Sequence, residues 1–469
     1  MNSMKKFIIS ITVVLMLVSG AENTVFLTGS AFSVDFDIAS EAAFMVNLDT
    51  DITVFRKNEF QPVFPASTTK IMTALVVLEH IENLNEFVLV TAAMNHNFGI
   101  NYNFQDAGVA DFEIGQPNLT YEDCLYALML HSACDAANIL AHNVGLRNGG
   151  EGISTFIEMM NEKARELGCV NTNFANPHGL HQKNNYTTAY DMFLITKYVW
   201  DKYPKFVEIV SEPRYHFPAN SRYPSGITLA NTNRLIQNNA ENPYFYEFAQ
   251  GVKTGSINRY LDVDTGEFSP GNFNLVSVAS RSGYTYLLVT LNAPFHQADG
   301  ATRSFAVYDD HLALYRWAFS SLEYRAVLSV NDILGQVLVT NGQDADRVQL
   351  QPVGDFNYLL PANIDGSAIM RDVTLFSEAV EAPVERGEIL GFVELKLADE
   401  VLTRIDLVAV NGVEKSFEAR VVRSVTGIFG TVWFQAGVAA VAALTLFVAA
   451  LRIMNSRRNK ARDRNRRKW

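Results

Sequence analysis

The segment from Pro65 to Leu78 has the sequence Pro-Ala-Ser-Thr-Thr-Lys-Ile-Met-Thr-Ala-Leu-Val-Val-Leu and decides the fold of the chain. Its periodicity predicts a helix over residues 67–81, because apolar residues recur at spacings of three and four: Ile71, Ala74, Leu75 and Leu78. The apolar stripe, extended towards the N-terminus, passes through Lys70 and Ser67. A lysine on such a stripe is costly to bury unless it is paired or deprotonated. We therefore interpret Lys70 as a lysine of lowered pKa that activates the Ser67 hydroxyl, with a solvated lysine at the helix end as the alternative.

Two further short segments carry side chains that suit a catalytic site. The first, Lys253-Thr254-Gly255, falls on a strand predicted over residues 245–255. A cation beside a hydroxyl forms a carboxylate clamp there, and the glycine lets a ligand approach the backbone. The second is Ser132, between the end of one predicted helix and the start of another. Each has a simpler explanation, a solvated lysine in a turn or a helix-capping serine, and about one or two Ser-x-x-Lys pairs occur by chance in a chain of this length.

Together, these segments resemble the three motifs of a known enzyme family. The matching stretches are Pro65–Ala74, Ser132–Asn138 and Lys253–Gly255, with Asn176–Leu180 and Tyr186–Met192 as further similar stretches. They resemble the low-molecular-mass penicillin-binding proteins, which are serine-type D-alanyl-D-alanine carboxypeptidases. The resemblance covers residues 42–324, and the order and spacing of several motifs make it highly specific.

The resemblance implies a role for each matching catalytic residue. Ser67 would be the nucleophile that forms an acyl-enzyme, Lys70 its general base, and Ser132 the group that passes a proton to the leaving D-alanine nitrogen. Lys253 and Thr254 would hold the terminal carboxylate of the substrate. Because Lys253 is a second cation near Lys70, it would help to keep Lys70 neutral enough to act as a base.

The implied substrate-binding set also contains Cys134, Gly255 and Ser256, and the backbone N–H groups of Ser67 and Ser256 would form the oxyanion hole. The implied activity is removal of the terminal D-alanine from peptidoglycan stem pentapeptides, which limits cross-linking. β-Lactams would be covalent inhibitors that acylate Ser67. The resemblance implies neither a metal nor a cofactor.

Cys134 departs from the family pattern, in which an asparagine usually occupies the third position of the middle motif. An amide donates and accepts hydrogen bonds well, whereas a thiol does both weakly. Catalysis therefore persists with a reduced rate or altered specificity, or the protein binds its ligand without efficient turnover; we favour retained activity. Asn138 is not a substitute, because it lies four residues further along the chain, outside the motif.

Other classes of protein fit the sequence less well. A β-lactamase would need a deacylating carboxylate, but no Glu-x-x-Leu-Asn stretch lies between Ser132 and Lys253. A D,D-endopeptidase shares the whole mechanism, and the sequence does not separate it from a carboxypeptidase. A non-catalytic wall-binding protein is the alternative that Cys134 suggests. His178 and His181 do not predict a metal site, because no carboxylate–histidine pattern completes a set of ligands.

The pattern of elements predicts an α+β domain in which an antiparallel sheet carries a helical insert. The resemblance implies that this is a β-lactamase/transpeptidase-like catalytic domain, over residues 22–324. The predicted strands pair as two hairpins, Ala43–Asp49 with Ile52–Arg56 and Leu275–Ser280 with Tyr284–Leu291. The predicted helices of the insert include Cys124–Leu130, which follows a capping box at Thr120–Asp123, and Ile153–Leu167. After Tyr324, alternating strands at Ile389–Leu397 and Val401–Val410 predict a small all-β domain over residues 325–425.

The charge distribution predicts an exported protein with a membrane anchor. The net charge of the 469 residues is −12, which argues against a nucleic-acid partner. Residues 452–469 carry +8 and residues 1–21 carry +2, so the intervening chain carries −22. Residues 428–451 are uncharged and long enough for a transmembrane helix, and the basic tail after them predicts a cytoplasmic C-terminus with the catalytic body outside the cell. Residues 1–21 have the pattern of a secretory signal peptide.

The three cysteines, Cys124, Cys134 and Cys169, are too few for a disulfide scaffold. If Cys124 and Cys134 share one helix they lie about 15 Å apart, too far for a disulfide. The fold is therefore expected to depend on its hydrophobic core.

Overall fold

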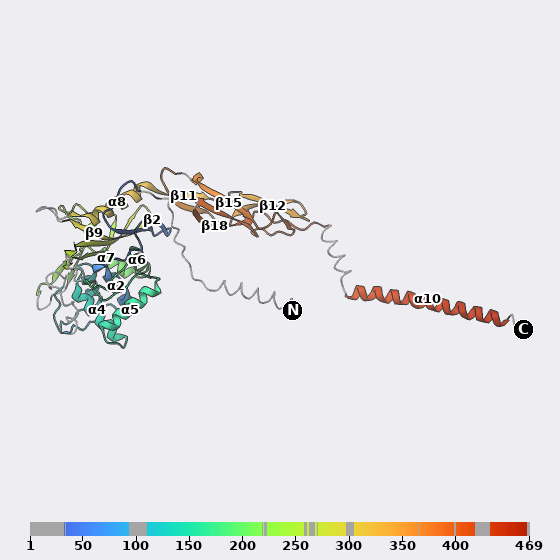
Figure 1. The fold of residues 1–469 in the computed structure, drawn as a ribbon, viewed down its shortest axis with the longest axis horizontal. Coiled ribbons are helices and arrows are strands. Elements are labelled where there is room, and N and C mark those ends of the chain that lie inside the picture. The colour runs from blue at the N-terminus through green and yellow to red at the C-terminus, as the bar shows by residue number, and fades with distance from the viewer. Residues whose placement is uncertain are drawn as a thin grey trace. The chain divides into compact units, whose positions relative to one another are not determined.

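The computed structural model describes residues 32, 34–92, 110–217, 219, 223–257, 260–261, 268–269, 271–296, 304–364, 366–397, 400–417 and 432–466 (Figure 1). The chain divides into two units, which we describe separately. The first is Met1–Arg325 with Tyr358–Asp365, and the second is Ala326–Asn357 with Gly366–Trp469. The predicted signal peptide, residues 1–21, lies outside the described residues.

An antiparallel sheet with the strand order β2-β1-β9-β8-β5 forms the centre of the first unit, and β10 pairs with β9. The strands are β1 (Ala42–Asn47), β2 (Ile52–Lys57), β5 (Ala249–Ile257), β8 (Asn272–Arg281), β9 (Tyr284–His296) and β10 (Ser304–Phe305). Two small hairpins pair β3 (Arg214–Phe217) with β4 (Ile227–Ala230) and β6 (Tyr260–Leu261) with β7 (Phe268–Ser269). Because β1 pairs directly with β9, the helices between β2 and β5 are an insert, and the predicted α+β class is confirmed.

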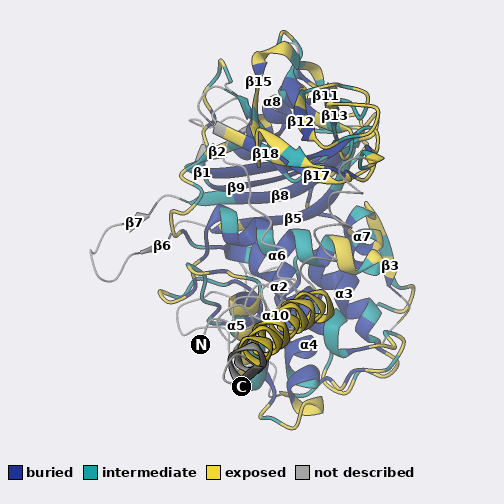
Figure 2. Ribbon diagram, turned by 90° about the vertical axis from the view of Figure 1, so that its right-hand side faces the viewer, coloured by how far each residue is buried: buried dark blue, intermediate teal, exposed yellow. Residues whose placement is uncertain are grey.

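The inserted helices lie on one side of the sheet and α8 (Ala306–Ser321) lies on the other (Figures 1 and 2). The insert contains α2 (Thr69–His80), α3 (Tyr121–Met129), α4 (Cys134–Arg147), α5 (Ile153–Glu166), α6 (Ala189–Lys202) and α7 (Pro204–Ser211). Successive side chains of strand β8 point to opposite faces of the sheet. Val276 and Val278 pack in the core with the inserted helices, whereas Ser277 forms a hydrogen bond with His311 of α8.

Helix α2 occupies the middle of the insert. The nine residues from Thr69 to Val77 are all buried, so the helix is enclosed on every side and has no exposed polar face over this stretch. The predicted apolar stripe was therefore too narrow, although the helix itself is confirmed. The capping box of α3 is also confirmed, since Thr120 Oγ1 accepts from the Asp123 amide at 3.1 Å and Asp123 accepts from the Thr120 amide at 3.0 Å.

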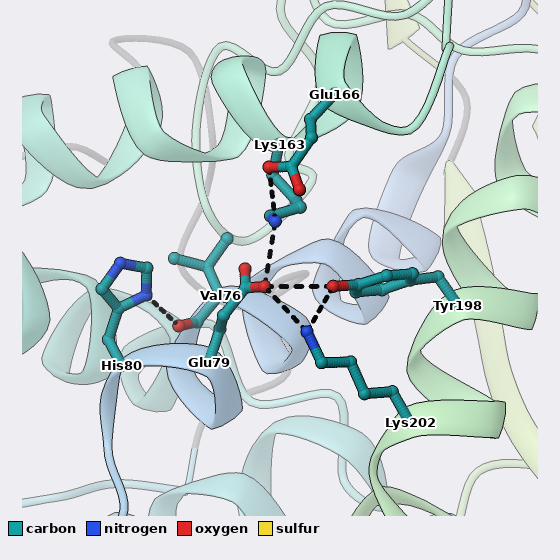
Figure 3. Close-up of polar contacts among 7 residues, drawn as sticks. All are labelled: Val76, Glu79, His80, Lys163, Glu166, Tyr198 and Lys202. Atoms are coloured by element: carbon teal, nitrogen blue, oxygen red, sulfur yellow. Dashed lines mark hydrogen bonds and ion pairs between the residues drawn. The ribbon is translucent and has the colours of Figure 1, made fainter. Parts of the chain in front are cut away.

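A polar network centred on Glu79 holds the C-terminal end of α2 against α5 and α6 (Figure 3). Lys163 Nζ lies 2.9 Å from Glu79 Oε1 and 2.6 Å from Glu166. Tyr198 donates to Glu79 Oε1 at 3.3 Å, and Lys202 lies 3.6 Å from the same oxygen. An acidic residue in the last turn of a helix is unfavourable for the helix dipole, and the two lysines offset this. The network fixes the far end of the helix that follows the turn with the candidate nucleophile Ser67.

Several predicted boundaries were wrong for physical reasons. The strand predicted over 245–255 begins only at Ala249, and its pairing with β8 shifts register near Val252, which has a φ of 105°. Tyr246 and Phe248, whose aromatic rings favoured a strand, pack instead against aromatic side chains of α8. Helices α6, α7 and α8 were not predicted from the sequence.

The second unit contains a six-stranded sheet with the order β15-β17-β18-β13-β12-β16, which confirms the predicted all-β domain. Its strands are β12 (Gly335–Thr340), β13 (Arg347–Pro352), β15 (Ile369–Leu375), β16 (Ala379–Glu381), β17 (Ile389–Leu397) and β18 (Glu400–Ala409). A separate pair is formed by β11 (Leu322–Leu328) and β14 (Phe356–Pro361), and the boundary between the units falls within both strands. Alternate residues of the large sheet, such as Val337, Leu350, Val393 and Leu407, are fully buried and form its core.

The C-terminal helix α10 (Val432–Arg466) is 35 residues long. Within it, the most apolar 18-residue stretch of Val432–Lys460 has a mean hydropathy of 2.1 and none of it is buried, so the helix is long and apolar enough to cross a membrane. Figure 2 shows residues 432–460 of this helix exposed. Residues 428–431 of the predicted span and residues 467–469 of the basic tail lie outside the described residues.

Candidate active site

Ser67 lies in a tight 3-10 turn, Ala66–Thr68 (η1), immediately before α2, rather than within the helix itself. Ala66 has a φ of 50°, an unusual conformation for a residue with a side chain, and the Thr68 hydroxyl donates to the Pro65 carbonyl at 2.6 Å. Ser67 is partly exposed whereas Thr68 and Lys70 are buried. The turn thus presents the serine hydroxyl at the surface of an otherwise closed core.

The amine of Lys70 contacts three groups. Its Nζ lies 3.0 Å from Ser67 Oγ, 3.5 Å from Cys134 Sγ and 2.5 Å from the carbonyl oxygen of His178. Lys70 is fully buried, and this desolvation lowers its pKa, while the neighbouring Cys134 acts in the opposite direction. A neutral amine can donate to the carbonyl and the thiol and still accept the Ser67 proton, which is the arrangement that a general base requires.

Strand β5 carries the second buried lysine. Lys253 Nζ donates to the carbonyl of Thr254 at 2.9 Å and lies 3.5 Å from the Thr254 hydroxyl. Burial holds the pKa of Lys253 well below its usual range, and the charge of Lys70 lowers it further. The charge of Lys70 therefore disfavours protonation of Lys253, whereas burial is the cause that lowers the pKa of Lys70, and the predicted effect of Lys253 on Lys70 stays a prediction.

Gly255 allows β5 to pass directly beside the Ala66–Thr68 turn that carries the candidate nucleophile Ser67, which we call the nucleophile turn. A Cβ atom at Gly255 would lie 3.0 Å from the Pro65 carbonyl oxygen and 3.1 Å from the amide nitrogens of both Ser67 and Thr68. The next residue, Ser256, is exposed. This close approach brings the backbone of β5 and the Ser67 amide to one place, as an oxyanion hole requires.

Ser132 occupies the turn between α3 and α4, where its φ of 60° is left-handed. In the described part of the chain, the side chain that joins this turn to Lys70 is Cys134, the first residue of α4, and not Ser132. The Cys134 thiol also points towards the Ser132 carbonyl, at 3.9 Å. Cys124 lies on α3, so it does not share a helix with Cys134, and all three cysteines are free.

The Asn176–Leu180 stretch supports Lys70 and the nucleophile turn through its backbone. Besides the His178 carbonyl, the Pro177 carbonyl accepts from Thr73 of α2 at 2.6 Å. Gly179 has a φ of 81°, and a Cβ atom there would lie 1.9 Å from the carbonyl oxygen of the nucleophile turn. His178 and His181 belong to no group of three metal-ligating side chains among the described residues.

Two residues that position the site were not predictable from the sequence motifs. Asn274 of β8 donates to the carbonyls of both Phe64 and Pro65 at 2.9 Å, and so fixes the chain just before the nucleophile turn. Thr232 lies with its hydroxyl 2.7 Å from that of Thr254. Neither has a local signature, because each acts across the fold on a segment distant in sequence.

The geometry can perform acyl transfer. It combines an accessible hydroxyl, a buried amine of lowered pKa within hydrogen-bond distance, and a lysine–threonine pair suited to a carboxylate. A penicillin-binding serine enzyme is the class of protein that this fold and site define.

Comparisons with known proteins place the chain within that class. A model of the D-alanyl-D-alanine carboxypeptidase family matches residues 28–294, and a model of the penicillin-binding protein 5 C-terminal domain matches residues 322–415. The chain belongs to the D-alanyl-D-alanine carboxypeptidase family, as the resemblance of its motifs predicted.

Individual relatives agree. The D-alanyl-D-alanine carboxypeptidase DacF of Bacillus subtilis is 25% identical over 81% of this chain and 88% of its own length. The D-alanyl-D-alanine carboxypeptidase of Streptomyces sp. (strain K15) is 30% identical over 56% of this chain and 84% of its own. The crystal structure of penicillin-binding protein 5 from Haemophilus influenzae shares the fold, with a TM-score of 0.57 and 21% identity over 82% of this chain and all of that one.

Proposed function

We propose that this protein is a serine-type D-alanyl-D-alanine carboxypeptidase that removes the terminal D-alanine from peptidoglycan stem pentapeptides through an acyl-enzyme on Ser67. The observation that carries the proposal is the buried Lys70 amine, 3.0 Å from the Ser67 hydroxyl. The family to which the chain belongs supports the same activity. It does not favour the alternatives of a D,D-endopeptidase or a wall-binding protein without efficient turnover.

In the acylation step, Lys70 accepts the Ser67 proton while Ser67 Oγ attacks the carbonyl carbon between the two D-alanines. The developing oxyanion is held by the backbone N–H groups of Ser67 and Ser256, beside the close approach at Gly255. The C–N bond then breaks, and Ser132 passes its proton to the leaving nitrogen and takes up the proton that Lys70 accepted, which returns Lys70 to its neutral form. Water hydrolyses the ester, which releases the shortened peptide and returns the proton to Ser67.

Lys253 and Thr254 bind the terminal carboxylate of the substrate in this proposal. A carboxylate next to Lys253 favours its protonated form and so offsets the desolvation that otherwise lowers its pKa. Substrate binding and charge on Lys253 are thereby coupled, whereas Lys70 stays buried and suited to act as a base.

Cys134 takes the position of the family's asparagine without breaking the network, because its thiol contacts Lys70 at 3.5 Å. This contact supports retained catalysis rather than loss of turnover. The thiol is the weaker partner for a substrate amide, so we expect a lower rate than an asparagine would give.

We also propose that the protein is exported and anchored by α10. The proposed divisions are a signal peptide over residues 1–21, a catalytic domain over 22–324, a β-rich domain over 325–425, a transmembrane helix over 428–451 and a cytoplasmic tail over 452–469. The apolar stretch of α10 and the basic residues that follow it support this topology.

The full-length protein in detergent tests the activity with a diacylated L-Lys-D-Ala-D-Ala peptide. We expect the wild type to release D-alanine and the Ser67→Ala variant to release none. Absence of release by the wild type, or equal release by the variant, would contradict the proposal. A cross-linked muropeptide assayed in parallel distinguishes an endopeptidase, which would cleave it in preference to the linear peptide.

A further inference from the structure

A threonine hydroxyl outside the three motifs lies against the proposed carboxylate clamp. Thr232 Oγ1 is 2.7 Å from Thr254 Oγ1, and Lys253 Nζ lies 3.5 Å from the same Thr254 oxygen. Lys253 and Thr254 are 1% and 5% exposed, whereas Thr232 is exposed. The two hydroxyls therefore connect the buried lysine with the solvent-facing rim of the site.

Two backbone hydrogen bonds hold Thr232, one through its amide and one through its carbonyl, and so fix the point from which its side chain extends. The Thr232 amide donates to the Leu130 carbonyl at 2.8 Å, two residues before Ser132. The Thr232 carbonyl accepts from the Tyr308 hydroxyl of α8 at 3.2 Å. Both bonds use main-chain atoms of Thr232, and a substitution of its side chain leaves them in place.

The count of hydrogens determines which threonine donates when a ligand is bound. A hydroxyl has one hydrogen to donate. When Thr254 donates its hydrogen to a carboxylate, the 2.7 Å contact between the two hydroxyls can be filled only by the hydrogen of Thr232. Thr254 then has a donor on one side and the carboxylate on the other.

We infer that Thr232 is a positioning residue of the carboxylate clamp, whose hydroxyl donates to Thr254 and directs the Thr254 hydrogen at the terminal carboxylate of the substrate. This inference rests on the proposed role of Thr254 in substrate binding. It predicts that selectivity for a free carboxylate depends on a residue that lies 22 positions before Thr254 and outside the recognised motifs.

Two matched variants test the inference in the full-length protein. Thr232→Val keeps the shape of the side chain without the hydroxyl, and Thr232→Ser keeps the hydroxyl. The readout is the ratio of the rates at which benzylpenicillin and its methyl ester acylate the protein, because only the former has a free carboxylate. We expect this ratio to fall about tenfold in Thr232→Val, the upper end for a hydrogen bond between neutral groups, and to change less than about twofold in Thr232→Ser.

The peptide substrate gives a second readout. Because the clamp binds a group that does not react, Thr232→Val is expected to raise KM about tenfold with kcat nearly unchanged. An unchanged penicillin ratio in Thr232→Val, or an equal loss in Thr232→Ser, would overturn the inference.

Thr254→Val separates failure of the inference from failure of the proposed function. If Thr254→Val lowers the ratio and Thr232→Val does not, the clamp stands and the role of Thr232 is wrong. If Thr254→Val leaves the ratio unchanged, the clamp itself is wrong and the inference falls with it. The double variant is expected to match Thr254→Val alone, since Thr232 acts only through Thr254.

Discussion

Replacement of His311 by glutamine is expected to weaken the pH dependence of the stability of the first unit, which contains the candidate active site and which we call the catalytic unit. His311 of α8 is fully buried between hydroxyls of two strands: its Nδ1 lies 2.8 Å from Ser277 Oγ on β8, and its Nε2 lies 2.8 Å from Thr290 Oγ1 on β9. Tyr315 donates to the Ser277 carbonyl at 2.9 Å and completes the cluster. Burial lowers the pKa of His311 to about 3, so the imidazole stays neutral in the folded protein.

The sign and size of the effect follow from this shift. An unfolded histidine titrates near a pKa of about 6.5, so between about pH 6.5 and pH 3 the unfolded chain binds a proton that the folded chain does not. Stability therefore falls as the pH decreases through this window. The loss from His311 alone is about 0.7 kcal/mol at pH 6 and about 2 kcal/mol at pH 5, relative to pH 7.

Urea unfolding followed by tryptophan fluorescence measures this contribution, because Trp200 on α6 and Trp317 on α8 both lie in the catalytic unit. Glutamine donates and accepts hydrogen bonds as a neutral imidazole does, and it does not titrate. The decisive quantity is the change in unfolding free energy between about pH 7 and pH 5, which should be about 2 kcal/mol smaller in His311→Gln. Parallel pH profiles for the wild type and the variant would refute the reasoning.

Three further substitutions have expected outcomes. Gly179→Ala should destabilise the catalytic unit by at least about 2 kcal/mol more than Gly168→Ala and should abolish penicillin labelling. Both glycines have a φ of 81°, but only at Gly179 would the added Cβ lie 1.9 Å from a carbonyl oxygen. Equal urea midpoints of the two variants would contradict this. Cys134→Asn should raise kcat/KM for the peptide about tenfold, because an amide is a stronger partner for Lys70 and the substrate than a thiol; an unchanged or lower rate would show that the cysteine is no handicap. Glu79→Gln should lower the free energy of unfolding by about 1–3 kcal/mol, measured by thermal or urea unfolding. Glu166→Gln, at a more exposed carboxylate, should change it by less than about 0.5 kcal/mol. Equal effects would show that Glu79 is not the centre of the network.

The parts of the site that the sequence could predict are those encoded within short segments. Ser67 and Lys70 lie one helical turn apart, and Lys253, Thr254 and Gly255 are consecutive, so their proximity follows from local geometry. The structure brings these two segments together through the close approach of β5 to the nucleophile turn. The α+β class was likewise predictable, because its hairpins and capping box have local signatures.

The parts that the sequence could not predict depend on contacts between distant segments. Thr232 and Asn274 act on residues 22 and more than 200 positions away, respectively. Aromatic residues before β5 favoured a strand because their packing against α8 has no local signal. The apolar stripe of α2 was too narrow for a similar reason, since burial on every side depends on the helices that surround it.

Mass spectrometry of the full-length protein after incubation with benzylpenicillin tests the central claim most directly, since the proposed mechanism requires a covalent ester on Ser67. We expect one penicilloyl group per chain, mapped by proteolysis to Ser67, and none in Ser67→Ala protein that unfolds at the wild-type urea midpoint. An adduct on any other residue, or equal labelling of the Ser67→Ala protein, would contradict the account.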